Sequence, residues 1–201
     1  MKNKDDNNSF VLELNAPYSL NYLIFMQNIT LNNSNDDKPL FPYLDSTNWG
    51  LKKDEEFAGT FREVWNTAVQ KNSSNRKYDH NGILKYDVTL YQSFFENNEK
   101  GTQGFNESIK SFLAWWDRVY GKLAVQSVVE PYGLDDIYIE LSKSIKTSSE
   151  KRLYIDLIYD KPAIAQYIAN SWHCVLPVEE ILHTKYRVRL LAKLLKCCDN
   201  D

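Results

Sequence analysis

Turn-forming residues are scarce along this chain, and their scarcity limits the folds that it can adopt. Only seven glycines and six prolines occur in 201 residues. Sandwiches and barrels of many strands need frequent tight turns, which these residues usually supply. A chain of this length holds one domain or at most two small ones, and it can bury a substantial core. The sequence therefore favours a few long elements over many short strands.

Apolar residues recur at helical spacing over most of the chain. The clearest helix begins at Asp54, where three consecutive carboxylates suit the positive end of a helix dipole. The apolar stripe that follows has the spacing of one buried helix face: Phe57, Phe61, Val64, Trp65, Ala68 and Val69. A turn at residues 101–104 and an N-cap at Asn106 predict a central helix over 106–123. Further helices are predicted over residues 19–29, 83–97, 135–145, 150–158, 163–172 and 177–196.

These segments predict a mainly α fold, a single-domain bundle of about seven to eight helices over residues 10–198. Residues 1–9 are expected to form a disordered leader. The alternative is an α+β fold with a short N-terminal strand and a hairpin near residues 137–158, because both regions also alternate at the period of a strand. The alternating sets are Phe10, Leu12 and Leu14; Ile137, Ile139 and Leu141; and Leu153, Ile155 and Leu157.

The apolar runs and the cysteines of the sequence predict the compartment and the redox state of the protein. The longest apolar run, residues 20–26, is too short to cross a bilayer, and residues 1–9 lack the apolar stretch of a signal peptide. Three cysteines, of which Cys197 and Cys198 are adjacent, do not form a disulfide framework. We predict a soluble, reduced, cytoplasmic protein that is rich in aromatic residues and uses no cofactor and no resident metal.

The first group of candidate catalytic residues is His173, Cys174, Glu180 and His183. Glu180 and His183 are three residues apart on the predicted helix, the spacing by which di-iron bundles present a carboxylate and an imidazole. Such a site needs a second pair of this kind, and zinc ligands that are adjacent in sequence rarely converge on one ion. Cys174 beside His173 also has the composition of a thiol nucleophile with its base, although the third, orienting group is not evident. A buried, unreactive cysteine and boundary histidines are the simpler interpretation.

The second group consists of cations on the C-terminal helix: Lys185, Arg187, Arg189 and Lys193. A basic amphipathic helix can bind phosphates, anionic lipid headgroups or an acidic partner. Cations near a helix C-terminus also complement its dipole, which is the simpler interpretation. So few cations disfavour nucleic acid as a partner.

Recognised catalytic motifs are missing from the sequence: it has no glycine-rich phosphate loop, no metal-spaced Cys/His set, no nucleophile elbow and no HExxH. The leading hypothesis is therefore a non-enzymatic protein-interaction or regulatory module that uses a helical surface around residues 177–196. One alternative is a small metal-assisted or thiol-dependent enzyme that uses residues 173–183. The other is a binder of anionic surfaces through the basic helix. Self-association into a homo-oligomer is left open.

Overall fold

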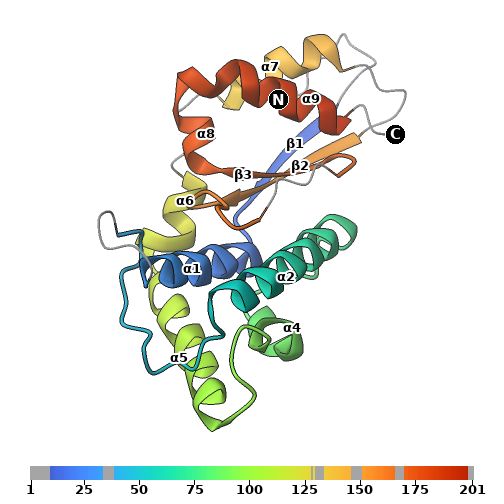
Figure 1. The fold of residues 1–201 in the computed structure, drawn as a ribbon. Helices are drawn as coiled ribbons and strands as arrows, with labels where there is room; N and C mark the ends of the chain where they lie inside the picture. Colours follow the sequence, from blue (N-terminus) through green and yellow to red (C-terminus); the bar gives the residue numbers. More distant parts are fainter. Residues whose placement is uncertain are drawn as a thin grey trace. The chain divides into compact units, whose positions relative to one another are not determined.

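The computed structural model describes residues 10–33, 39–127, 129, 134–145, 151–165 and 170–198, so the predicted leader lies outside it. Helices dominate, and three short strands form one sheet (Figure 1). The chain groups into two compact units. Unit 1 is drawn from residues 1–16, 123–160 and 168–201, and unit 2 from residues 17–122 and 161–167. Unit 2 is thus inserted into the sequence of unit 1, while the expectation of one folding domain stays a prediction.

The sheet belongs to unit 1 and is parallel. Its strands are β1 (Phe10–Asn15), β2 (Lys151–Ile158) and β3 (His173–Pro177), in the order β1-β2-β3. Both pairings are parallel, with Leu12 opposite Leu153 and Ile155 opposite Cys174. The predicted N-terminal strand is confirmed. Residues 151–158 form a strand, as the alternative fold requires, but it pairs with β1 and β3, and the segment before it is the helix α7 (Leu134–Ser144).

Helices α7 and α9 (Arg187–Cys198) lie together over one face of this sheet (Figure 1). Each helix buries a short apolar stripe, which includes Ile137 and Leu141 in α7 and Leu190 and Leu194 in α9. Unit 1 also contains the short helices α6 (Ala124–Ser127) and α8 (Val178–Leu182). The predicted helix over 177–196 is therefore interrupted: His183 has an extended backbone with ψ of 116°, and one 3₁₀ turn, Thr184–Tyr186, leads into α9.

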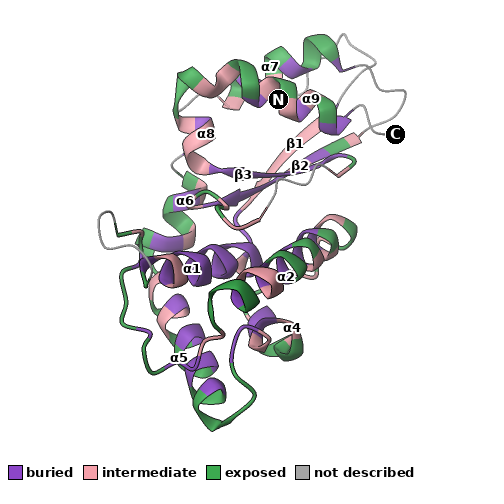
Figure 2. Ribbon diagram, in the orientation of Figure 1, coloured by how far each residue is buried: buried purple, intermediate pink, exposed green. Residues whose placement is uncertain are grey.

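Unit 2 is built around α1 (Tyr18–Asn32), which buries twelve of its fifteen residues (Figure 2). The rings of Tyr22 and Phe25 each lie 5.5 Å from that of Phe112 in α5 (Glu99–Trp116). The Tyr22 hydroxyl is 2.7 Å from that of Ser108, and burial raises the pKa of this phenol above its ordinary value. Unit 2 also contains the helices α2 (Asp54–Ser74), α3 (Ile83–Tyr86) and α4 (Val88–Gln92). The central position expected for residues 106–123 therefore belongs to α1.

Buried polar residues of α1 hold the loops around it. The side chain of Asn32 accepts a hydrogen bond from Leu40 N at 2.7 Å and donates to Leu40 O at 2.8 Å. The side chain of Gln27 likewise accepts from Ala163 N at 2.7 Å. Because a buried amide without partners costs about 1–3 kcal/mol, these contacts bind the loops firmly to the helix.

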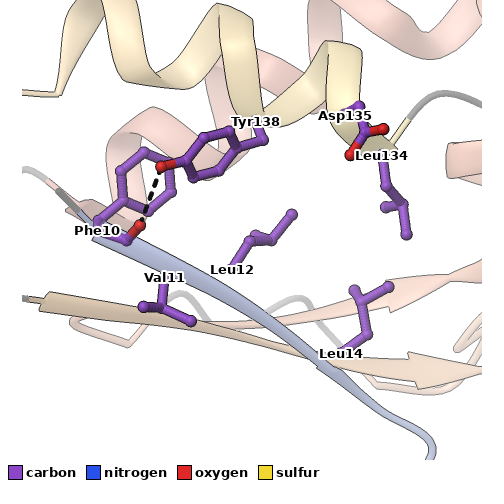
Figure 3. A pocket seen from close by; sticks show the side chains of 7 residues that line it. All are labelled: Phe10, Val11, Leu12, Leu14, Leu134, Asp135 and Tyr138. Atoms are coloured by element: carbon purple, nitrogen blue, oxygen red, sulfur yellow. Dashed lines mark hydrogen bonds between the residues drawn. The ribbon is translucent and has the colours of Figure 1, made fainter. Parts of the chain in front are cut away.

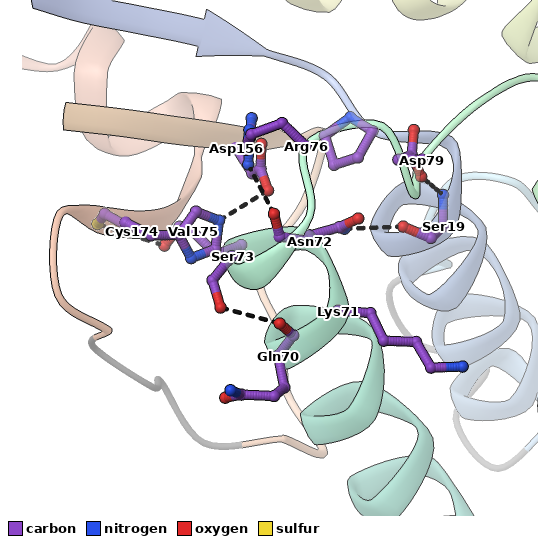
Figure 4. A network of polar contacts seen from close by, with 12 residues as sticks. Ser19, Gln70, Lys71, Asn72, Ser73, Arg76, Asp79, Asp156, Cys174 and Val175 are labelled. Atoms are coloured by element: carbon purple, nitrogen blue, oxygen red, sulfur yellow. Dashed lines mark hydrogen bonds and ion pairs between the residues drawn. The ribbon is translucent and has the colours of Figure 1, made fainter. Parts of the chain in front are cut away.

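The N-terminus of α1 is capped from a distant loop. Both carboxylate oxygens of Asp79 accept backbone hydrogen bonds at 2.8 Å, from Tyr18 N and Ser19 N. Figure 4 shows this contact and the hydrogen bond that the Asn72 side chain of α2 donates to Ser19 Oγ at 2.9 Å. An N-cap hydrogen bond usually comes from the side chain of the residue at the helix start, which here is Pro17 and has no side-chain oxygen. A residue 60 positions away in sequence supplies it instead.

Three further predicted helices need correction. The central one runs from Glu99 to Trp116 rather than over residues 106–123, and its N-cap Asn98 accepts from Gly101 N at 2.8 Å. Residues 83–97 contain two short helices, with Asp87 between them in a non-helical conformation. Residues 163–165 are bent rather than helical, 166–169 lie outside the described residues, and Trp172 has a left-handed backbone with φ of 54°.

Candidate functional site

His173 and Cys174, adjacent in β3, lie on opposite faces of the sheet because side chains alternate along a strand. Cys174 shares the face of Ile155, while His173 shares that of Asp156 in β2. His173 Nε2 is 2.8 Å from Asp156 Oδ2, and both side chains are buried. The base that Cys174 would need therefore points away from its thiol, towards a carboxylate.

Asp156 is a partner that the sequence analysis missed. Its signal was a single acidic residue inside the apolar run of residues 153–158, which the helical interpretation left unexplained. The second ring nitrogen of His173, Nδ1, is buried and has no hydrogen-bond partner among the described residues. Both side chains are nearly inaccessible, at 0% for Asp156 and 2% for His173. This pair is thus closed to solvent.

Glu180 and His183 do not join the pair. Glu180 is bound by Lys193 Nζ, which lies 2.8 and 2.6 Å from its two carboxylate oxygens. His183 is exposed and packs its ring against Tyr186 at 6.2 Å. Since α8 ends at Leu182, Glu180 and His183 do not share a helix face as predicted. Within the described ranges no group of three or more His, Cys, Asp and Glu residues could hold a metal ion.

The four C-terminal cations are also dispersed. Lys193 belongs to the ion pair with Glu180, and Arg187 Nε lies 3.5 Å from Glu140 Oε2 of α7. Lys185 lies over the ring of Tyr186 at 4.7 Å, while Arg189 is exposed. The predicted stripe therefore contributes contacts to the fold of unit 1 and is not one continuous basic surface.

An apolar groove lies between β1 and α7 in unit 1. It has a volume of about 440 Å³, and residues of both elements line it: Phe10, Val11, Leu12, Leu14, Leu134, Asp135 and Tyr138. In Figure 3, Leu12 and Leu14 rise from β1 towards α7. The rings of Phe10 and Tyr138 close one end, with centroids 4.9 Å apart, and the Tyr138 hydroxyl donates to Phe10 O at 3.3 Å. The volume is within the range of ligand sites, which are mostly apolar with few polar groups.

This groove follows the outer edge of β1. Phe10, Val11 and Leu12 all line it, although Val11 points to the opposite face of the sheet (Figure 3). Consecutive strand residues can border one recess only where it reaches their shared backbone. β1 is an edge strand, because β2 is its one partner in the described part of the chain. Five of its six residues are half-exposed, whereas every residue of the other edge strand, β3, is buried.

Sequence reasoning predicted both walls of the groove, the N-terminal strand and the helix near 135–145, but not that they meet. A second recess, of about 670 Å³, lies in unit 2 and is lined mostly by polar residues, among them Asp45, Asn48, Gln103 and Lys110.

Comparison of the chain with family models, curated proteins and solved structures gives no match. Among the helices described, none combines the length and apolar character needed to span a bilayer.

Proposed function

We propose that this protein binds another protein, and that its binding site is the groove between β1 and α7. The observation that carries the proposal is the course of the groove along the half-exposed edge of β1. An edge strand presents peptide N–H and C=O groups in a row, and proteins commonly use such an edge to bind a partner segment. Apolar side chains beside that edge add the hydrophobic contribution that backbone hydrogen bonds alone do not give.

Half-exposed leucines support the same site. Leu12, Leu14 and Leu134 are intermediate in exposure, and all three line the groove. Fully burying a leucine side chain stabilises by about 1.5–3 kcal/mol, so a partner that covers these residues gains part of that free energy from each. The groove therefore supports a protein-interaction role better than the helical surface near residues 177–196, where Arg187 and Lys193 have ion-pair partners within unit 1.

The proposal predicts that the groove selects peptides. The probe is a library of random dodecapeptides displayed on phage and selected on the immobilised full chain. We expect enriched peptides whose synthetic forms bind the wild-type protein and lose at least tenfold in affinity to the Leu14→Lys variant. The matched control is Ile139→Lys, because Ile139 is 49% exposed on α7 and does not line the groove.

A second groove variant, Leu134→Gln, separates lost binding from lost folding, and far-UV circular dichroism of each variant checks the fold. Peptides that bind Leu14→Lys and Leu134→Gln as well as they bind the wild type would place their site elsewhere. Failure to enrich any peptide that depends on the groove would overturn the proposal.

A further inference from the structure

The shape of the groove restricts the conformation of a bound segment. Its lining runs from Phe10 to Leu14, four residue steps of about 3.3 Å each, or roughly 13 Å along the strand. An extended segment of about five residues spans that distance. A helix needs about nine residues to span that distance, and its N–H and C=O groups are paired within the helix, so it cannot pair with the edge of β1.

The edge of β1 also specifies how such a segment would be held. In a parallel or antiparallel ladder, alternate residues direct their N–H and C=O groups to one neighbour and the remaining residues direct theirs away. Since β2 occupies one side of β1, about half of the β1 backbone groups face away from β2. A strand added along residues 11–15 satisfies those groups and extends the sheet to a fourth strand, while Phe10 O already accepts from the Tyr138 hydroxyl.

Alternation of side chains gives the pattern of the occupant. Phe10, Leu12 and Leu14 share one face of β1 because side chains alternate along a strand, and Figure 3 shows Leu12 and Leu14 directed towards α7. In an added strand every second side chain lies on this same face and enters the groove, while the others lie on the opposite face. Apolar residues at alternate positions therefore match the groove.

Among the described residues that line the groove, Asp135 carries the one formal charge, and it is exposed at the start of α7. An exposed carboxylate beside an apolar groove favours a cationic side chain in the partner, with a modest contribution because solvent screens it. Asp136, its neighbour, is also exposed but does not line the groove, and so provides a matched control.

We infer that the partner segment is an extended strand of about five residues that pairs with the edge of β1 opposite β2, which no other described strand covers. It carries apolar side chains at alternate positions and a lysine or arginine opposite Asp135. This inference rests on the proposed function, since it names the partner of the same groove.

The test uses a seven-residue synthetic peptide in which valine alternates with threonine and one terminal residue is lysine. Fluorescence anisotropy measures the affinity of the peptide for the full chain. Two isomers carry N-methyl groups on alternate residues, one isomer on each alternating set. Only one set of N–H groups faces β1, so we expect one isomer to lose at least tenfold in affinity while the other keeps the affinity of the parent. Each lost backbone hydrogen bond is worth about 1 kcal/mol, or roughly fivefold.

The charged contact is tested on the same peptide. Asp135→Asn should weaken binding roughly threefold at low salt, whereas Asp136→Asn should leave it within experimental error. A control peptide with the same residues, but with its valines in one block, should bind at least tenfold more weakly than the alternating one.

Several results would overturn the inference. Equal affinities of the two N-methyl isomers would exclude strand pairing with β1. If phage-selected peptides still required Leu14 in that case, the proposed function would stand and only the strand pairing would be wrong. Displacement of the alternating peptide by a peptide of residues 1–9 would assign the groove to the chain's own N-terminal segment. Self-association that is lost in Leu14→Lys, measured by sedimentation velocity, would assign it to a second copy.

Discussion

Gly101 and Gly104 are three residues apart and so lie on the same side of α5, where the chain packs backbone against backbone. A Cβ atom at Gly104 would lie 1.9 Å from Trp49 O, and one at Gly101 would lie 2.0 Å from Glu96 O. Backbone atoms cannot move aside as the end of a flexible side chain can, so these sites exclude every side chain. The two glycines of the G-x-x-G segment, which the sequence predicts as a turn, therefore form a contact surface on a helix.

We predict that Gly104→Ala lowers the free energy of unfolding by about 3 kcal/mol, because the added methyl group overpacks a rigid contact. The control is Gly59→Ala in α2, where a Cβ would meet nothing within 4 Å. That change should raise the free energy of unfolding by about 1 kcal/mol, since alanine is the better helix former. Urea unfolding followed by circular dichroism measures both, and similar effects of the two changes would contradict the packing described here.

At the scale of elements, the C-terminal region shows how tertiary contacts divide a predicted helix. The sequence predicts one helix over residues 177–196, yet α8 and α9 are separate. Their relative placement brings Glu180 of α8 to Lys193 of α9, with side chains only 15% and 18% exposed. In one straight helix these residues would be thirteen positions, or about 20 Å, apart along the axis. The break at His183 is what permits the ion pair.

We expect Lys193→Ala to lower the free energy of unfolding by about 2 kcal/mol, because it leaves the Glu180 carboxylate largely buried without this cation. Arg189→Ala, at an exposed position of the same helix, should change it by less than about 0.5 kcal/mol. Thermal unfolding of the two variants in parallel makes the comparison. A greater loss of unfolding free energy from Arg189→Ala than from Lys193→Ala would contradict the stabilising role assigned to the Glu180–Lys193 ion pair.

Across the whole molecule, the order of the chain links the two units. β1 precedes unit 2 in sequence and β2 follows α6 and α7, so the register of Leu12 with Leu153 closes a loop that contains residues 17–122. An unfolded unit 2 would make that closure entropically more costly, although the cost grows only slowly with loop length. This connectivity favours joint unfolding.

We therefore predict that both units unfold together, as the expectation of one domain over residues 10–198 requires. The chain has five tryptophans, of which Trp172 belongs to unit 1 and Trp49, Trp65, Trp115 and Trp116 to unit 2. Fluorine NMR of protein labelled with 5-fluorotryptophan follows each one through a urea titration, with Trp172→Phe to assign its signal. All five native signals should disappear at one urea concentration. A separate midpoint for Trp172 would show that the units unfold independently.

The sequence by itself determined the elements whose signal is local. The carboxylates at 54–56 and the stripe behind them predict α2, and the alternation of Phe10, Leu12 and Leu14 predicts β1, because helix and strand periods are properties of neighbouring residues. The mainly helical class follows from the same periods. Residues 151–158 were open to two interpretations, since the segment fits both periods.

Only the tertiary structure decided which elements meet. The parallel pairing of β1 with β2, the Asp156–His173 contact and the groove between β1 and α7 each join residues that are far apart in sequence or on different elements. The cap that Asp79 provides for α1 is of the same kind. Local periodicity records which face of an element is apolar but not which element covers it. The candidate site is therefore a product of packing, and its residues have no motif in the sequence.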